Sequence, residues 1–391
     1  MKVLHIEDRF HPGMGYQINF FARYHHPDHP FSILTADSAR LWSASGEATD
    51  FREIDREFER AYGVSIIRLP TTLDRRNRQN LWLKGLTGAI RKIDPDILYV
   101  HTIESYSSLR VILSRRTLSR YRVFFDTHTL LNQFQSGLKF KMLLWFLRNV
   151  ASKRMVRFDA KVFATVPENR MILEKKYGIP ADRILYSPIG TDLILFGYDP
   201  VRRTRLREKE QIGQQECVLL YTGKINRRKN PHLVLKALEL IETKINVPFY
   251  IYFVGASDQA YFEENMKVGF INEKIHVKFV PAVPVPELAG WYSMADFAVF
   301  PAENTLSALD AQACSLPVIM QEDMTNTERL KKGGLTYERG NLRDLSEKIL
   351  WMIGNPDRRK AMGSAGAAYI KATFDYRKIV EKMEADLGLL R

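Results

Sequence analysis

The sequence predicts an α/β protein built from two doubly wound parallel sheets. Short apolar segments typical of strands alternate with amphipathic helical segments along most of its 391 residues, and such alternation indicates a parallel sheet with helices on both faces. The alternation stops at Pro188–Asp192 and the charged segment Asp199–Gln215, and it resumes at Cys217. Because the chain is too long for one compact core, we expect two domains that face each other across a cleft.

The first half contains seven short apolar segments that we expect to form strands. They are Met1–Glu7, Phe31–Thr35, Val64–Leu69, Ile97–His101, Arg122–Asp126, Ala160–Thr165 and Ile184–Ser187. The helices expected between them are Tyr16 to about Arg23, a charged helix before Val64, Leu81–Lys92, Leu138–Phe158 and Pro167–Tyr177.

The second half repeats the alternation. Its expected strands, each followed by a helix, are Val218–Tyr221, Phe249–Gly255, His276–Phe279, Ala295–Phe300 and Pro317–Met320. Phe374–Arg391 is expected to end the chain as a helix. We therefore divide the chain into residues 1–195, 196–373 and 374–391.

The segment from Val218 to Ala237 has the strongest local signal for a binding site. A strand that ends at Gly223 leads into a short basic loop, and Pro231 then opens an amphipathic helix that Asn230 is expected to cap. The cations of this loop are Lys224, Arg227, Arg228 and Lys229. A helix N-terminus with cations beside it can hold a phosphate or diphosphate. The alternative is a solvated basic loop without a ligand.

Two glycines, Gly13 and Gly15, follow the first strand. Glycine lets the backbone come close to a ligand or to another segment. Ligands of doubly wound sheets bind at the carboxyl ends of strands, which is where these glycines and the basic loop are expected to lie. The alternative for Gly13 is a simple turn.

The composition indicates a folded protein with a strongly basic surface. Hydrophobic residues make up 45% of the chain and the net charge is +13. Eleven Lys and Arg but three Asp and Glu lie between His101 and Ala160. Such a field favours polyanions, so nucleic acid, anionic lipid and phosphorylated small molecules all stay open.

The basic helix Leu138–Arg157 contains six cations, no acid, and the aromatic residues Phe140, Trp145 and Phe146. A basic amphipathic helix with aromatic residues can lie on anionic lipid. The alternative is an ordinary helix that covers the sheet and turns a charged face to solvent.

The cysteine content and the N-terminus suggest a cellular location. The chain has two cysteines, Cys217 and Cys314, which implies no disulfide framework and favours a reducing compartment. Charge interrupts the apolar start at Met1–Phe10, unlike in a signal peptide, and no apolar run approaches the roughly 18 residues of a membrane span. We expect a cytoplasmic protein, either soluble or peripheral on the inner face of the plasma membrane.

Seven short motifs occur along nearly the whole chain in a characteristic order. They are Gly15–Gln17 after the first strand, Asp94–His101, Asp126–His128, Ser187–Asp192, Leu220–Lys229, Asp310–Ile319, and Gly334–Tyr337 with Asn341 and Asp344. Together they resemble the GT-B-fold retaining glycosyltransferases of the family-4 type, also called glycosyl transferases group 1. The resemblance implies two Rossmann-like domains and transfer of a hexose-type sugar from a nucleoside-diphosphate sugar to a glycan or lipid-linked acceptor. It also implies an N-terminal acceptor domain, a C-terminal donor domain and a last helix that crosses back to the first domain.

The resemblance also implies roles for individual residues. Lys224 and Lys229 would hold the donor diphosphate, Asp310 would bind the nucleotide ribose, and His128 would lie by the donor sugar. The expected catalytic residues are His128, Lys224, Lys229 and Glu303. The expected donor-binding residues are Gly13, Gly15, Lys224, Lys229, Asn304, Thr305, Leu306 and Asp310. Each of two residues also has a structural alternative. His128 can be a hydrogen-bonded structural histidine at a strand end, and Asp310 can be a cap residue at a helix N-terminus.

Several positions depart from the family pattern. Lys224 stands where the family usually has Arg, which keeps the charge but loses the planar fork of donors. Asp310 replaces the usual Glu, and Ser315 the usual Gly. Position 302, where the family has a second acid, is Ala. Either Glu303 supplies that carboxylate after a one-residue gap, or the chain lacks it.

Other functions stay open beside an active transferase. A catalytically degenerate GT-B binding or scaffold protein is supported by Ala302 and Ser315. An epimerase would need a fuller set of acids and histidines, a phosphorylase of the glycogen type would need a longer chain, and nucleic-acid binding lacks a recognisable reading motif. Asp94-Pro95-Asp96 superficially resembles an Asp-x-Asp metal site, but it precedes a strand and is expected to form a turn. We predict no metal and no cofactor apart from the nucleotide-sugar substrate.

Overall fold

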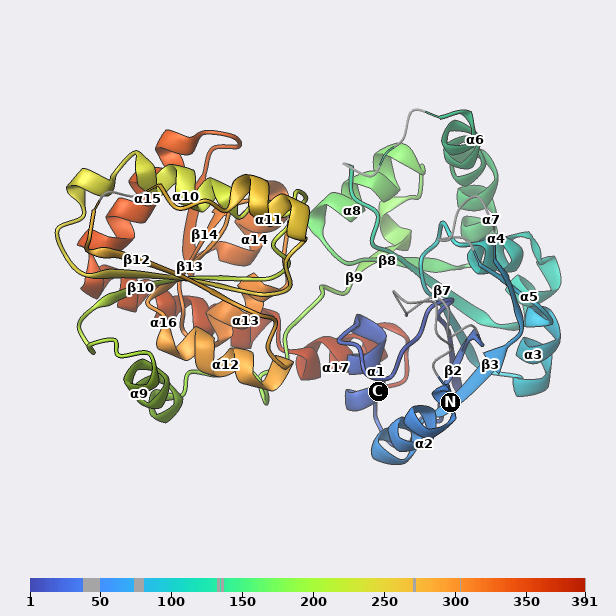
Figure 1. The fold of residues 1–391 in the computed structure, drawn as a ribbon. Helices are drawn as coiled ribbons and strands as arrows, with labels where there is room; N and C mark the ends of the chain where they lie inside the picture. The colour runs from blue at the N-terminus through green and yellow to red at the C-terminus, as the bar shows by residue number, and fades with distance from the viewer. Residues whose placement is uncertain are drawn as a thin grey trace. The chain divides into compact units, whose positions relative to one another are not determined.

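The computed structural model describes residues 1–37, 50–73, 81–131, 134, 137–269, 272–302 and 304–390. The chain divides into two compact units, one formed by Met1–Ile189 with Tyr376–Arg391 and the other by Gly190–Asp375 (Figure 1). The first unit thus ends at Ile189, whereas the sequence suggested a boundary after residue 195.

The sheet of the first unit has seven strands in the order β3-β2-β1-β6-β7-β8-β9, and all neighbouring strands are parallel. The strands are β1 (Val3–Ile6), β2 (Phe31–Ala36), β3 (Ser65–Leu69), β6 (Ile97–Val100), β7 (Arg122–Thr127), β8 (Lys161–Ala164) and β9 (Ile184–Tyr186). They match the seven predicted strands. The strand order switches direction between β1 and β6, and ligands of such sheets bind at the carboxyl ends of the strands beside this point.

Helices cover both faces of this sheet because the strands are apolar on both sides. Leu4 and Ile6 of β1 belong to one buried cluster and Val3 to another. The helices packed on the first cluster include α3 (Leu86–Ile93), α4 (Tyr106–Leu113), α5 (Arg115–Arg120) and α7 (Ser152–Arg157), and those on the second include α1 (Gln17–Tyr24), α2 (Phe51–Tyr62) and α17 (Tyr376–Asp386). The last helix, α17, packs on α1, where the rings of Tyr376 and Phe20 stack with centroids 4.0 Å apart.

Two short helices of the first unit continue through a π-helical segment. The predicted helix Leu138–Phe158 consists of α6 (Leu138–Phe146), a π turn (Leu147–Ala151) and α7. The predicted helix Pro167–Tyr177 likewise consists of α8 (Pro167–Met171) and a π turn (Ile172–Lys176). Among the described residues, no helix combines the length and apolar character needed to cross a bilayer.

The predicted helix Leu81–Lys92 is wrong at its beginning. Residues Leu81–Leu83 form strand β5, which pairs with β4 (Thr71–Leu73) as a two-stranded antiparallel sheet. Leu81 and Leu83 are buried while Trp82 is exposed, so this segment alternates as a strand does. Gly85 then has a φ of 73°, which ends the strand, and α3 starts at Leu86.

The sheet of the second unit has six parallel strands in the order β12-β11-β10-β13-β14-β15. They are β10 (Cys217–Thr222), β11 (Phe249–Val254), β12 (Ile275–Val280), β13 (Phe297–Phe300), β14 (Val318–Gln321) and β15 (Gly334–Tyr337), and the last of these was not predicted as a strand. The helices include α9 (Pro200–Lys209), α10 (His232–Glu239), α11 (Gln259–Asn265), α12 (Val285–Met294), α13 (Ser307–Ala313), α14 (Met324–Leu330), α15 (Leu342–Gly354) and α16 (Pro356–Thr373).

The charged segment that interrupts the strand pattern is an integral helix of the second unit. Arg207 of α9 is fully buried, and its Nη2 donates to Asp296 Oδ2 at 2.7 Å. Its other donors bind the carbonyl oxygens of Met294, Gly213 and Glu216. Arginine at this position thus joins α9 to the end of α12 and the start of the sheet, although the sequence alone shows only a charged run.

Candidate functional site

The basic loop of the second unit lies beyond the carboxyl end of β10. Lys229 is partly buried, and its Nζ donates a 3.2 Å hydrogen bond to the carbonyl oxygen of Asn304, which follows β13. Lys224 is exposed, and its carbonyl oxygen accepts from the Tyr221 hydroxyl at 2.8 Å. The two predicted diphosphate ligands therefore differ: the ammonium of Lys229 is held in place, whereas that of Lys224 has no partner among the described residues.

This loop is braced by close backbone contact with the loop after β11. Gly223 has a φ of 135°, and a Cβ added at Gly255 would lie 1.9 Å from the Gly223 carbonyl oxygen. Ile225 N also donates to Ala256 O at 2.8 Å. Glycine at position 255 is therefore required by packing and allows the basic loop to adopt this path.

The prediction that Asn230 caps the following helix is wrong. Helix α10 begins at His232, with Pro231 at the N-cap position and no side chain as a cap, and Asn230 has a φ of 46°. The side chain of Asn226 instead accepts from Lys229 N at 3.0 Å. The side chain of Asn226 thus stabilises a turn within the basic loop, before α10 begins.

Asp310, the predicted ribose ligand, lies in the first turn of α13. Its Oδ1 accepts from the Thr191 hydroxyl at 2.6 Å. Burial raises the pKa of Asp310 to about 7, and the nearby carboxylate of Asp192 acts in the same direction, while the Thr191 hydrogen bond and the charge of Arg329 oppose the rise. A carboxyl group with this pKa changes its charge near neutral pH.

The segment before α13 has its carbonyl groups occupied within the unit. Arg329 donates to the Thr305 carbonyl oxygen at 3.2 Å, and Asp310 N donates to that of Leu306 at 3.2 Å. The side-chain Oδ1 of Asn304 is buried and accepts no hydrogen bond from the described residues, so it is available to a donor from a ligand. The predicted catalytic residue Glu303 lies outside the described residues.

These groups line a small pocket. Its volume is about 20 Å³, and Gly223, Lys229, Ala302 and Thr305 are among its lining residues. The structure thus brings Lys229 next to Asn304 and Thr305, and donor binding by this region stays a prediction.

The first unit contains a buried chain of hydrogen bonds at the carboxyl ends of β1, β6 and β7. His5 Nδ1 lies 3.1 Å from His101 Nε2, and His101 Nδ1 lies 2.6 Å from Asp126 Oδ2. Asp126 Oδ1 also accepts from Thr102 N at 2.6 Å. Burial by itself would raise the pKa of Asp126, but the histidines His101 and His128 hold it well below its usual range.

His128, the predicted sugar ligand, lies at the exposed end of this chain. Its Nε2 is 3.7 Å from Asp126 Oδ1, its Nδ1 is 3.4 Å from Thr165 Oγ1, and its side chain is 37% exposed. Burial lowers the pKa of His128, but the charge of Asp126 outweighs this effect and places the pKa above the ordinary 6.5. The imidazole is therefore held by a buried carboxylate while one side remains accessible.

Three further acids lie at the same edge of this sheet, and burial raises the pKa of each. The pKa of Asp8 rises to about 7 although the Ser107 hydroxyl donates to it at 2.5 Å. The pKa values of Glu7 and Glu104 rise as well. Glu104 Oε1 accepts from the hydroxyls of Thr127 and Tyr177, while its buried Oε2 has no partner among the described residues.

Gly13 and Gly15 lie in the exposed loop between β1 and α1. A Cβ at Gly13 would meet only the His11 ring, at 3.3 Å, and a Cβ at Gly15 would meet nothing within 4 Å. Neither glycine has a positive φ among those recorded for the described residues. The described residues of this unit therefore leave room for a side chain at position 15, and the role of Gly15 in donor binding stays a prediction.

Comparison with known proteins identifies the family. Residues 15–194 match the family model described as Glycosyltransferase Family 4, and residues 202–369 match the one described as Glycosyl transferases group 1. The chain belongs to the family-4-like GT-B glycosyltransferases. The predicted family and fold are thereby confirmed, whereas retention of configuration stays a prediction.

Among curated relatives of this glycosyltransferase family member is the D-inositol 3-phosphate glycosyltransferase of Pseudarthrobacter chlorophenolicus. It is 29% identical over 227 residues, which are 56% of this chain and 54% of the relative. The protein of the same name from Geodermatophilus obscurus is 28% identical over 239 residues, 58% of this chain and 52% of the relative. The matched part of the chain thus spans about half the length of these relatives.

Solved structures share the GT-B fold over the whole chain. A sucrose-phosphate synthase from Thermosynechococcus elongatus has a TM-score of 0.71 at 18% identity, covering 99% of this chain and 98% of that one. HepE from Anabaena in complex with UDP has a TM-score of 0.72 at 15% identity, and the match covers 100% of both chains.

Several residues of these sites were not singled out from the sequence. Arg329 contacts the Thr305 carbonyl from a helix whose sequence carries no motif, so nothing in the sequence points to it. Thr191 lies within the predicted Ser187–Asp192 motif, which is the one signal that could have found it. Glu104 becomes notable through its burial alone, which a sequence does not reveal.

The predicted turn Asp94–Asp96 is observed. Asp94 has a φ of 48° and pairs with Arg120, and Asp96 Oδ2 accepts from Lys2 N at 2.7 Å. Within the described ranges, no group of three or more His, Cys, Asp or Glu side chains is arranged to hold a metal ion. That the protein works without metal stays a prediction.

Proposed function

We propose that this protein transfers a hexose-type sugar from a nucleoside-diphosphate sugar to a glycan or lipid-linked acceptor. The observation that carries the proposal is the braced basic loop after β10, with Lys229 held against the Asn304 carbonyl oxygen. The relatives named as glycosyltransferases support it, as do structures of HepE with UDP and with UDP-glucose. The curated relatives are named for an inositol phosphate, and they are matched over about half of their length, so the acceptor proposed here is of a general class.

In this proposal the second unit binds the donor. Lys229 and Lys224 neutralise the diphosphate, and the carboxylate of Asp310 accepts hydrogen bonds from the ribose hydroxyls. Asn304 Oδ1, a buried acceptor without a partner among the described residues, accepts from a donor group of the nucleotide. Each of these contacts is a charge-assisted or buried hydrogen bond, and such bonds contribute most to the recognition of a polar ligand.

The transfer breaks the bond between the anomeric carbon and a diphosphate oxygen and forms a bond to the acceptor oxygen. We propose that the acceptor proton passes to a diphosphate oxygen and that attack occurs on the face from which the diphosphate leaves, so configuration is retained. Negative charge grows on the leaving diphosphate, which the two lysines stabilise. His128, held by Asp126, donates to a hydroxyl of the transferred sugar.

Nucleotide binding tests this proposal. We expect UDP, GDP or ADP to raise the melting temperature and to bind in calorimetry, and Lys229→Ala to weaken that binding about tenfold or more because a charge-assisted contact is lost. Lys244→Ala is the matched control, because Lys244 is exposed elsewhere in the same unit and should leave binding unchanged. If no nucleotide or nucleotide sugar binds, the scaffold function is favoured instead.

We also propose that the basic helix Leu138–Arg157 places the protein on an anionic membrane surface. Leu138, Met142 and Trp145 are 74%, 63% and 63% exposed, and their spacing puts them on one face of α6. The segment carries six cations and no acid. Exposed apolar side chains between cations are typical of a helix that lies in the headgroup region. A lipid-linked acceptor would be reached from this surface.

Sedimentation with vesicles tests the membrane proposal. The protein is expected to sediment with phosphatidylglycerol vesicles and not with phosphatidylcholine vesicles, and Trp145→Gln should weaken this several-fold. Trp82→Gln is the matched control, because Trp82 is 46% exposed in another part of the same unit. Equal binding to both vesicle types would refute the electrostatic part of the proposal.

A further inference from the structure

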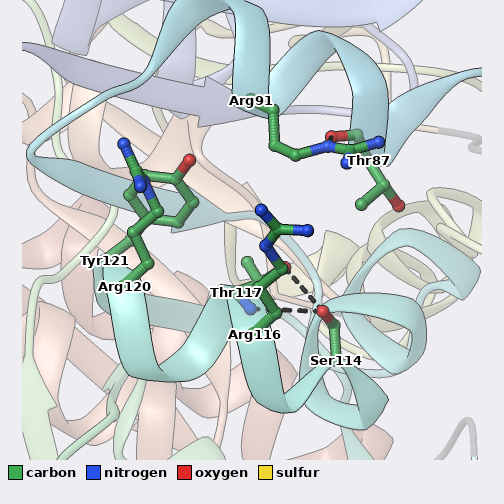
Figure 2. A pocket seen from close by; sticks show the side chains of 7 residues that line it. All are labelled: Thr87, Arg91, Ser114, Arg116, Thr117, Arg120 and Tyr121. Atoms are coloured by element: carbon green, nitrogen blue, oxygen red, sulfur yellow. Dashed lines mark hydrogen bonds between the residues drawn. The ribbon is translucent and has the colours of Figure 1, made fainter.

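A second basic feature of the first unit lies away from His128 and Asp126. A pocket of about 320 Å³ is formed between α3 and α5, and its lining includes Arg91, Arg116 and Arg120 (Figure 2). In Figure 2 the Arg116 side chain extends from α5 toward α3, and the Arg91 side chain runs along α3 toward Thr87. No carboxylate is among the lining residues.

The three guanidinium groups differ in whether a carboxylate balances their positive charge. Arg120 makes a bidentate contact with Asp94, with Nη2 2.8 Å from both carboxylate oxygens, so its charge is balanced. Arg91 donates through Nε to the Thr87 carbonyl oxygen at 3.3 Å, within its own helix. In the part of the chain that the structure describes, neither Arg91 nor Arg116 forms an ion pair. Two cationic groups thus border the pocket without an anion.

The backbone beneath Arg116 is firmly held. Ser114 caps α5, since its Oγ accepts from Thr117 N at 3.2 Å, and the hydroxyls of Ser114 and Thr117 lie 2.7 Å apart (Figure 2). Arg154 of α7 donates to the carbonyl oxygens of Ile112 and Leu113 just before this turn. The side chain of Arg116 therefore starts from a backbone segment that hydrogen bonds hold on both sides of the turn.

We propose that this pocket binds a phosphate-bearing anion. Like charges that border one pocket repel each other, and an anion in the pocket replaces this repulsion by attraction. The planar fork of arginine matches phosphate oxygens bidentately, so Arg91 and Arg116 can each present two N–H groups to one phosphate. The hydroxyl groups of Thr87 and Ser114 at the pocket wall can add hydrogen bonds to the ligand.

The pocket is a different site from the one that holds His128. Arg91 precedes β6 and Arg120 precedes β7, so the pocket lies toward the amino-terminal edge of the first sheet, whereas His128 follows the carboxyl end of β7. The ligand is therefore not the sugar donor bound for transfer. It is either a soluble phosphate compound or the headgroup of an anionic lipid, and the inference does not depend on the proposed transfer reaction.

Calorimetric titration of the full chain with inorganic pyrophosphate at low salt tests this site. Arg116→Ala is expected to weaken one class of binding about tenfold or more, because a charge-assisted contact is lost. Arg115→Ala is the matched control, because Arg115 is exposed on the same helix but does not line the pocket. Lys229→Ala should leave this class of binding unchanged, which separates it from a diphosphate bound in the second unit.

Two results would overturn the proposal. One is a titration of Arg116→Ala and of Arg91→Ala that superimposes on that of the unmodified protein. The other is an equal loss with Arg115→Ala, which would show a general effect of net charge. Once pyrophosphate is found to bind through Arg116, vesicles that contain phosphatidic acid identify the source of the phosphate. If pyrophosphate releases the protein from these vesicles, the ligand is a lipid headgroup. If the protein does not bind the vesicles, the ligand is a soluble compound.

Discussion

Replacement of Asp310 by Asn tests two properties of this carboxylate separately. One is its effect on the free energy of unfolding, and the other is its proposed contribution to nucleotide affinity. Asp310 accepts from the Thr191 hydroxyl at 2.6 Å, and burial raises its pKa to about 7. Asn has nearly the same shape and can accept the same hydrogen bond, but it never carries a charge. The variant therefore removes the charge and preserves the contact.

The effect on stability follows from the pKa. The folded-state pKa of about 7 lies above the reference value of 3.8, so the folded protein binds more protons than the unfolded chain between these pH values. The free energy of unfolding contributed by Asp310 is thus highest at low pH and falls as pH rises toward 7. Three pKa units correspond to about 4 kcal/mol, and solvent screening at this partly exposed side chain reduces the expected loss to about 1–2 kcal/mol.

Urea denaturation at pH 5 and pH 8 measures this loss. The free energy of unfolding of Asp310→Asn should exceed that of the unmodified protein by about 1–2 kcal/mol at pH 8 and by less than about half of that at pH 5, where only part of the loss has occurred. In calorimetry at pH 8 the same variant should bind nucleotide about tenfold more weakly, because hydrogen bonds to a charged acceptor are lost. Asp357→Asn, at an exposed position in the first turn of α16, is the control. A stability difference that is the same at both pH values would refute the assigned pKa.

Two other predictions concern the buried charges of the two units. Arg207→Ala should lower the free energy of unfolding by about 3–5 kcal/mol, because Asp296 loses its closest partner and three backbone carbonyl oxygens lose a charged donor. The exposed neighbour Arg205→Ala should change it by less than about 0.5 kcal/mol. Urea denaturation would contradict the assignment if the two variants behaved alike. Asp126→Asn should lower the pKa of His128, because burial then acts without the opposing charge of Asp126; an NMR titration of the His128 ring that does not shift to lower pH would show that Asp126 does not control this histidine.

The sequence located most of the secondary structure because parallel strands buried on both faces are short apolar runs. All seven strands of the first sheet were predicted, and five of the six strands of the second. The exceptions have physical reasons. Leu81–Leu83 was assigned to a helix because three residues are too few to show a period, and β15 (Gly334–Tyr337) was overlooked because it contains Gly and Thr among few apolar residues.

The candidate sites were predictable to the extent that loops after strands carry motifs. Lys229, Asp310 and His128 all follow or adjoin strand ends in the sequence, and the structure places each beyond the carboxyl end of a strand. The difference between Lys229, which is held by the Asn304 carbonyl oxygen, and the exposed Lys224 could not be foreseen. It depends on how two loops distant in the sequence meet.

The sequence by itself determined the two-sheet α/β architecture and the order of the strands along the chain, because hydrophobic periodicity and turn residues act locally. Only the tertiary structure decided what the polar groups contact. Examples are the series of hydrogen bonds that links His5, His101 and Asp126, the Thr191–Asp310 hydrogen bond, and the arginine pocket between α3 and α5. The pKa shifts of Asp126 and Asp310 depend on burial and on neighbours far away in the sequence, and these are properties of the folded chain alone.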